Sequence, residues 1–224
     1  MTISIGVVDS GFRPDQQQQI IDSASFYLEE GALWMGACEF DAMDHGARII
    51  EIIHHHLESA EIYSAQVFDQ RGVTTPIQVA AAIDWLREQG VQLINLSLGL
   101  RQDREVLAKA VKRAVQQGVI ICASSPARGD PVYPSAYPGV FRMTGDARCT
   151  LNEISCLETE FADFGGHVLG LDQVQSKAGA SLGCAHMSGQ IAKLFAESGL
   201  LDFNELAARL KQRAAYFGPE HRLY

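Results

Sequence analysis

GASLGCAHMSG, residues 179–189, is the most informative segment of the sequence. It places a serine, Ser181, between small residues and then continues as a helix of Gly, Ala, Cys and Ser with a single histidine. A helix with so little side-chain volume lacks the broad apolar stripe by which an ordinary surface helix packs. The rest of the chain has to explain why such a helix follows directly behind a serine.

Strand-length apolar runs alternate along the chain with longer segments of helical period. The first run, residues 3–8, is β-branched and ends at Asp9, as expected of a central parallel strand. Three further runs follow at residues 62–68, 91–99 and 119–124. In parallel sheets the reactive groups lie at the carboxyl ends of the strands, which selects Asp9 and the segments after Leu98 and Ala123.

The predicted helices carry clear boundary signals. Thr75 is expected to cap a helix that starts at Pro76 and stops at Gly90, and Asp103 to cap one that stops at Gly118. A third begins with a capping box of Asp202 and Glu205 and finishes at Gly218 and Pro219. Strand and helix in alternation predict an α/β fold, with a mainly parallel central sheet covered by helices on both faces. We find no repeat or linker, so we expect one domain over residues 1–224.

Composition narrows the class of partner. The 224 residues carry a net charge of −9 and no basic stripe, which argues against nucleic acid and anionic membranes. No apolar run has the length of a membrane span, and the first residues already form a predicted strand rather than a signal peptide. The five cysteines show no metal or CxxC spacing, so we expect reduced thiols, no metal site, no cofactor and a cytoplasmic location.

Three chemistry-bearing blocks occur in the order Asp, His, Ser: VVDSG with Asp9, DHGARIIEII with His45, and GASLGCAHMSG with Ser181. This is one of the known chain orders of the serine nucleophile triad. A serine hydroxyl attacks an amide only when an imidazole removes its proton and a buried carboxylate holds that imidazole in one tautomer.

These blocks resemble those of the subtilisin-like serine proteases of the S8 type. VQLINLSLG resembles the substrate-binding strand of that family, and SASF (23–26) and YPSAYPGV (133–140) are weaker matches in the family's order. The resemblance runs from residue 3 to about residue 217 and implies the subtilisin-like fold. It also explains why a helix of small residues follows directly behind Ser181. In that fold the serine helix crosses the middle of the molecule, where small residues let other elements approach, and its N-terminal N–H groups point to the oxyanion.

The resemblance implies a substrate site as well. An extended peptide would lie antiparallel to Ser97, Leu98, Gly99 and Leu100, with Ala123 nearby. Val132 stands where broad-spectrum members often have glycine at the floor of the first specificity pocket. We therefore expect a preference for a small residue on the acyl side of the cut.

One departure concerns the oxyanion hole. The asparagine that the family uses as side-chain donor is replaced here by Pro126 or Ala127, neither of which can donate from its side chain. The remaining candidates are the Ser181 backbone N–H and the hydroxyls of Ser124 or Ser125. In this family, which is the standard example, losing the asparagine costs about two to three orders of magnitude in rate.

Plainer interpretations exist for each residue. Asp9 would suit a turn, His45 an exposed helix start and Ser181 an N-cap; only their joint order favours catalysis. His186 is expected to be a packed, hydrogen-bonded core residue, and Cys122 and Cys184 apolar fillers. His54, His55 and His56 are expected to form the solvated end of a helix.

Size and missing targeting narrow the resemblance to small subtilisin-like maturation proteases that remove leader peptides from enzymatically modified peptides. One such enzyme trims the cross-linked small subunit of quinohemoprotein amine dehydrogenase. The expected partner is then a precursor peptide or polypeptide, with its modifying enzyme as a further candidate. The alternative is a catalytically weak or inactive pseudoprotease that binds peptides. A nucleotide-binding domain is disfavoured because no glycine-rich phosphate loop follows a strand.

Overall fold

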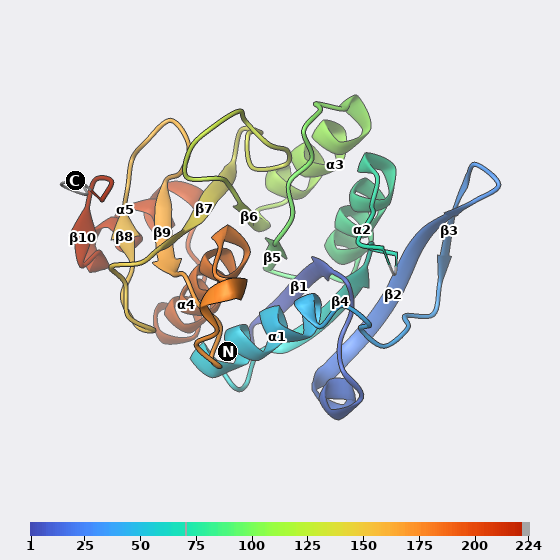
Figure 1. Cartoon of the computed structure of the whole chain (residues 1–224), viewed down its shortest axis with the longest axis horizontal. Coiled ribbons are helices and arrows are strands. Elements are labelled where there is room, and N and C mark those ends of the chain that lie inside the picture. Colours follow the sequence, from blue (N-terminus) through green and yellow to red (C-terminus); the bar gives the residue numbers. More distant parts are fainter. Residues whose placement is uncertain (70, 221–224) are drawn as a thin grey trace.

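The computed structural model describes residues 1–69 and 71–220; the last four residues of the expected domain, 221–224, lie outside the described part. A ten-stranded sheet runs through the described chain in the order β10-β8-β9-β7-β6-β5-β1-β4-β2-β3 (Figure 1). The strands are β1 (Ser4–Asp9), β2 (Ile20–Glu29), β3 (Ala32–Gly36), β4 (Glu61–Gln66), β5 (Leu93–Leu96), β6 (Ile120–Ser124), β7 (Val140–Asp146), β8 (Ser155–Cys156), β9 (Phe164–His167) and β10 (Tyr216–Phe217). Pairing is parallel except for β2 with β3 and β8 with β9, which confirms a mainly parallel sheet.

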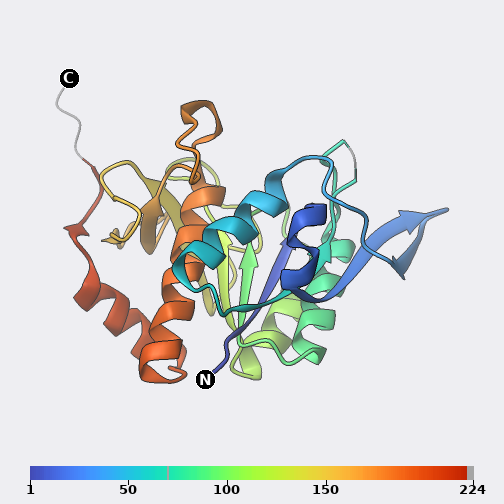
Figure 2. The ribbon, with the colours of Figure 1, turned by 90° about the horizontal axis from the view of Figure 1, so that it is seen from below.

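Helices cover both faces of the sheet, as expected (Figure 2). The α-helices are α1 (His45–His56), α2 (Pro76–Glu88), α3 (Glu105–Gln116), α4 (Ala180–Ser198) and α5 (Phe203–Arg213), with short 3₁₀ helices at Pro14–Gln19 and Gln175–Lys177. α1 and α4 pack against each other on one face, and α2 and α3 on the other. Two apolar clusters result, one on each side of the sheet. Among the described residues no helix is long and apolar enough to cross a membrane.

Two predicted helix boundaries were wrong, because tertiary contacts supply what the local signals did not. Asp103 does not cap α3, whose N-cap is Arg104; its carboxylate instead accepts a 2.6 Å hydrogen bond from the Tyr137 hydroxyl. α5 begins with the predicted capping box of Asp202 but ends at Arg213, since residues 216 and 217 form β10 and pair with β8. The start of α2 at Pro76 is confirmed.

Candidate active site

The N-terminus of α1 is held against the end of β1, which brings His45 to Asp9. The Asp41 carboxylate accepts hydrogen bonds from three backbone N–H groups at this helix start, those of Met43, Asp44 and Ala47. Gly46 allows the close approach, because a Cβ there would lie 2.5 Å from the Gly11 carbonyl oxygen. The sequence DHG therefore has a steric reason: the residue after the histidine has to be glycine.

Asp9 and His45 form a buried carboxylate–imidazole pair. Asp9 is 1% exposed, and its Oδ1 accepts from His45 Nδ1 at 2.7 Å and from the Ser10 backbone N–H at 2.8 Å. Burial alone would lower the pKa of His45, but the hydrogen bond and charge of Asp9 outweigh it and raise that pKa. Because Nδ1 donates to Asp9, the lone pair of the neutral imidazole lies on Nε2, where a general base needs it.

Ser181 is the second residue of α4 and is tied to the substrate strand. Its Oγ donates to the Ser97 carbonyl at 3.1 Å, and the Ser97 Oγ donates back to the Ser181 carbonyl at 3.0 Å. Among the described residues, no hydrogen bond joins the Ser181 hydroxyl to His45. The structure thus pairs two of the three predicted catalytic residues directly and fixes the third to Ser97.

The small residues of α4 allow the sheet and α1 to approach it, as predicted. A Cβ on Gly183 would lie 2.2 Å from the Thr144 carbonyl oxygen and 2.6 Å from Gly145 Cα, both backbone atoms of β7. A Cβ on Gly189 would lie 2.7 Å from the His56 ring. Cys184, on the same helix, is fully buried, and burial raises the pKa of its thiol well above the ordinary value. α4 is therefore positioned by backbone contact, and Ser181 with it.

The predicted substrate strand continues from β5 and lies beside the segment that contains Val132. Leu100 and Tyr133 form an antiparallel bridge, with N–H to carbonyl distances of 2.7 and 2.8 Å. Val132 packs on Gly99, since a Cβ on that glycine would be 2.9 Å from Val132 Cγ2. Leu98 and Ala123 are buried, whereas Gly99 is exposed. The branched side chain therefore stands over the segment that the resemblance assigns to the substrate.

Neither hydroxyl predicted for the oxyanion hole is free. Ser124 Oγ donates to the Leu98 carbonyl at 3.3 Å, and Ser125 Oγ donates to the Phe161 carbonyl at 2.7 Å. Both serines are buried. The N–H groups at the start of α4, including that of Ser181, are the donors that this end of the helix offers to an oxyanion.

Sequence reasoning missed the side chains that support this site. Asn95, fully buried in β5, donates to Ser97 Oγ at 3.0 Å and accepts from Ser188 Oγ at 2.9 Å. The signal was an amide, Asn95, in the middle of the apolar run VQLINLSLG. Arg48, buried one turn after His45, forms an ion pair with Asp172 in the segment that leads to α4. A charged residue on the apolar face of α1 would have indicated such a pair.

The histidine prediction was correct for His186 and wrong for His56. His186 is fully buried; its Nε2 donates to the Leu169 carbonyl at 2.9 Å, and its Nδ1 lies 2.9 Å from His56 Nε2. His56 is therefore buried against α4, His54 is half-buried, and His55 is the exposed member of the run. The last turn of α1 packs against α4, where a Cβ on Gly189 would lie 2.7 Å from the His56 ring, so this turn reaches the core instead of solvent.

Within residues 1–69 and 71–220, no group of acidic, histidine and cysteine side chains has the arrangement of a metal site. The five cysteines are free thiols.

The sequence model of the subtilase family, peptidase S8, matches residues 1–144. The chain belongs to the subtilase family. Asp9 and His45 lie inside the matched segment, and Ser181 lies beyond it.

Individual relatives of this subtilase are named proteases. The minor extracellular protease Epr of Bacillus subtilis is 31% identical over 63% of this chain, which spans 23% of that protein. The thermostable alkaline protease of Halalkalibacterium halodurans is 25% identical over 96% of this chain and 62% of its own length. The chain thus spans less than two thirds of these two relatives.

Solved structures show the same fold. Sphericase aligns with a TM-score of 0.66 at 18% identity, over 96% of this chain and 85% of its own. A psychrophilic protease, S41, aligns with a TM-score of 0.68 at 20% identity, over 95% and 83%. The fold of this subtilase is subtilisin-like.

Proposed function

We propose that this subtilase is a serine endopeptidase in which Asp9, His45 and Ser181 form the catalytic triad. The observation that carries the proposal is the 2.7 Å hydrogen bond between the buried Asp9 carboxylate and His45 Nδ1. A carboxylate in this position holds the imidazole in the tautomer that a base requires and stabilises its cation.

The chemistry begins when the Ser181 hydroxyl leaves the Ser97 carbonyl by rotation of its side chain. His45 Nε2 then removes the proton of Oγ as the oxygen attacks the peptide carbonyl, and later returns that proton to the leaving amine. The negative charge of the tetrahedral intermediate is stabilised by the N–H groups and dipole at the start of α4.

The test is covalent labelling. A fluorophosphonate reacts with an activated serine, so we expect labelling of wild-type protein and none of Ser181→Ala. Ser10→Ala is no control, because that hydroxyl accepts from the Gly46 N–H at α1. Thr159→Ser, remote in sequence from the triad, serves better. Equal labelling of wild type and Ser181→Ala, or labelling of neither, would refute the triad.

A peptide-binding pseudoprotease is the second candidate. It is favoured by the lack of a side-chain donor at Pro126 and Ala127, and by the hydroxyls of Ser124 and Ser125, which are already engaged. A protein that binds peptides without labelling or cleavage would support this candidate over the endopeptidase.

Substrate choice follows from Val132. Its contact with Gly99 supports a shallow first pocket, so cleavage after Gly, Ala or Ser is proposed. A peptide panel with efficient cleavage after Phe, Tyr or Leu would contradict this.

The proposed biological role is removal of a leader peptide from a modified precursor in the cytoplasm, as in maturation of the small subunit of quinohemoprotein amine dehydrogenase. A narrow pocket and a reduced oxyanion hole support a dedicated protease over a digestive one, and the acidic chain suits a cationic precursor. Candidate precursors, alone and with their modifying enzyme, are incubated with wild type and with Ser181→Ala, and the products are weighed by mass spectrometry. A single cut made only by wild type is the expected result, and general degradation is the result that opposes it.

A further inference from the structure

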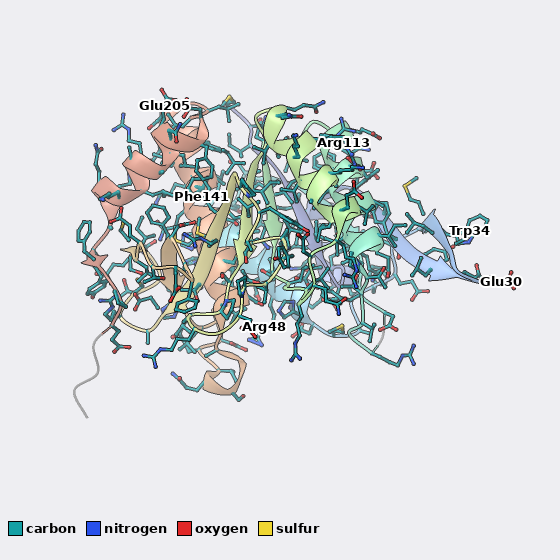
Figure 3. The ribbon with its side chains drawn as sticks, turned by 90° about the horizontal axis from the view of Figure 1, so that it is seen from above. Glu30, Trp34, Arg48, Arg113, Phe141 and Glu205 are labelled. Carbon is teal, nitrogen blue, oxygen red and sulfur yellow. The ribbon has the colours of Figure 1, made fainter. Side chains whose placement is uncertain are left out.

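The β2–β3 hairpin projects from the end of the sheet, and β3 is an unprotected edge strand (Figure 3). It turns at Glu30 and Gly31, which both have positive φ, the geometry of a tight two-residue hairpin. All of β3 except Gly36 is exposed. Trp34 and Met35 are 52% and 62% exposed, although they are the largest side chains of the strand.

The edge lacks the features that keep sheet edges apart. Natural edge strands are usually blunted by Lys, Pro, a bulge or a covering loop. β3 reads Ala-Leu-Trp-Met-Gly, without charge or proline, in a chain whose net charge is −9. Its pairing with β2 is regular over five residues, and in the described chain no strand lies beyond it. An apolar edge of this kind is suited to pairing with another strand.

We propose that this edge is a homodimer interface, in which β3 pairs antiparallel with β3 of a second copy about a two-fold axis at Trp34. This pairing places Leu33 opposite Met35 of the second copy, Ala32 opposite Gly36, and Trp34 opposite Trp34. Every cross-strand pair is apolar and matches a large side chain with a large one or a small with a small. Such self-complementarity is what a two-fold interface requires.

Both faces of the joined sheet continue across the axis. On one face, Trp34 neighbours Tyr27 within the hairpin, so the two copies form a ladder of four aromatic rings. On the other face, Leu33 neighbours Leu28, and Met35 of the second copy extends that row. Tyr27 and Leu28, each about two-fifths exposed, lie on β2, one strand further from the axis, so they flank the contact on either side.

The buried area and the net charge of each copy determine the affinity of the proposed dimer. The three large side chains of β3, Leu33, Trp34 and Met35, offer roughly 100 Å² each, so the two copies would bury roughly 600 Å² of side chain, which is the size of a weak, transient interface. The net charge of each copy opposes association, but the acidic turn residues Glu29 and Glu30 fall at opposite ends of an antiparallel contact. We therefore expect a reversible dimer whose affinity rises with added salt, because salt screens the repulsion between the two acidic copies. A cationic peptide on the same edge would instead lose affinity as salt is added.

Sedimentation velocity over a range of concentrations tests the proposal. Wild type is expected to shift from monomer to dimer, and Trp34→Lys to remain monomeric because two ammonium groups would meet at the axis. Met35→Lys is a second disruptive variant. Phe217→Lys is the matched control, since Phe217 is also 62% exposed but lies on β10 at the opposite end of the sheet. It should dimerise like wild type.

A cross-link tests the register. In the antiparallel arrangement, Trp34→Cys brings two thiols together and should give a disulfide-linked dimer under mild oxidation, while Phe217→Cys should not. Wild type that stays monomeric at all concentrations, a dimer unaffected by both lysine variants on β3, or absence of the Trp34→Cys cross-link would overturn the proposal. Pairing of β3 with a different protein, without any self-association, would overturn it as well.

Discussion

Gly183→Ala tests whether α4 is positioned by direct contact with the backbone of β7. In an isolated helix this substitution stabilises by about 1 kcal/mol, because alanine has the higher helix propensity. Here the added Cβ would lie 2.2 Å from the Thr144 carbonyl oxygen and 2.6 Å from both Gly145 Cα and N. Helix and strand would have to separate by roughly 1 Å to reach ordinary carbon contact distance.

The expected result is a net loss of stability. Overpacking a core costs about 1–3 kcal/mol or more, and backbone atoms cannot rotate away as a side chain can. After the propensity gain is subtracted, we expect the free energy of unfolding to fall by about 2 kcal/mol. Fluorophosphonate labelling of Ser181, two residues upstream on the same helix, should slow as well.

The assay is urea unfolding of Gly183→Ala beside Gly179→Ala. A Cβ on Gly179 meets no atom within 4 Å, and its φ of 169° is ordinary extended backbone, so this control should stay near wild type. A Gly183→Ala protein that is as stable as wild type, with unchanged labelling, would refute the reasoning.

Four further outcomes are expected. Asp9→Asn should lower kcat by roughly four orders of magnitude, because an amide holds His45 in the wrong tautomer; a near-normal kcat in a peptide assay would contradict the triad. Val132→Gly should extend cleavage to peptides with a large residue before the cut, and an unchanged peptide-panel profile would argue against the pocket. Burial lowers the pKa values of His56 and His186 to about 3 and about 4, so both rings are neutral when folded while the unfolded chain binds protons below about pH 6.5. Stability should therefore fall as pH falls below 6.5, by up to about 1.4 kcal/mol per pH unit for each ring, and urea midpoints that stay flat to pH 4 would exclude this. Asp202→Ala should cost about 1 kcal/mol by removing the α5 cap, as chemical denaturation would show.

Local signals predicted the parts of the fold that local chemistry determines. β1 ends at Asp9, α2 starts at Pro76, and Asp202 caps α5 because strand ends, proline and capping carboxylates act within a few residues. Asp9, His45 and Ser181 lie at the end of β1, the start of α1 and the start of α4, and their catalytic role stays a proposal.

What the sequence did not reveal depends on long-range contact. His56 is buried because α4 lies across it. Its partner on α4, His186, is 130 residues away in the sequence. Asp103 bonds to Tyr137 rather than to its own helix. The hydroxyl of Ser181 donates to the carbonyl of Ser97, which is 84 residues away in the sequence. No short window of sequence contains both members of such a pair.

The hydrogen bond from the Ser181 hydroxyl to the Ser97 carbonyl affects the reactivity of this serine before a substrate binds. A peptide laid as an extra strand along residues 97–100 needs main-chain acceptors on the protein, and the Ser97 carbonyl, which holds the Ser181 hydroxyl, is one that this segment offers. Docking and nucleophile release would then be a single exchange, in which an incoming peptide N–H takes over the Ser97 carbonyl and frees the alcohol to attack the peptide carbonyl at the cut. Without a peptide, the hydroxyl would spend most of its time bound to this carbonyl, so a fluorophosphonate would still label Ser181, but more slowly than it labels a protease whose serine is unbound.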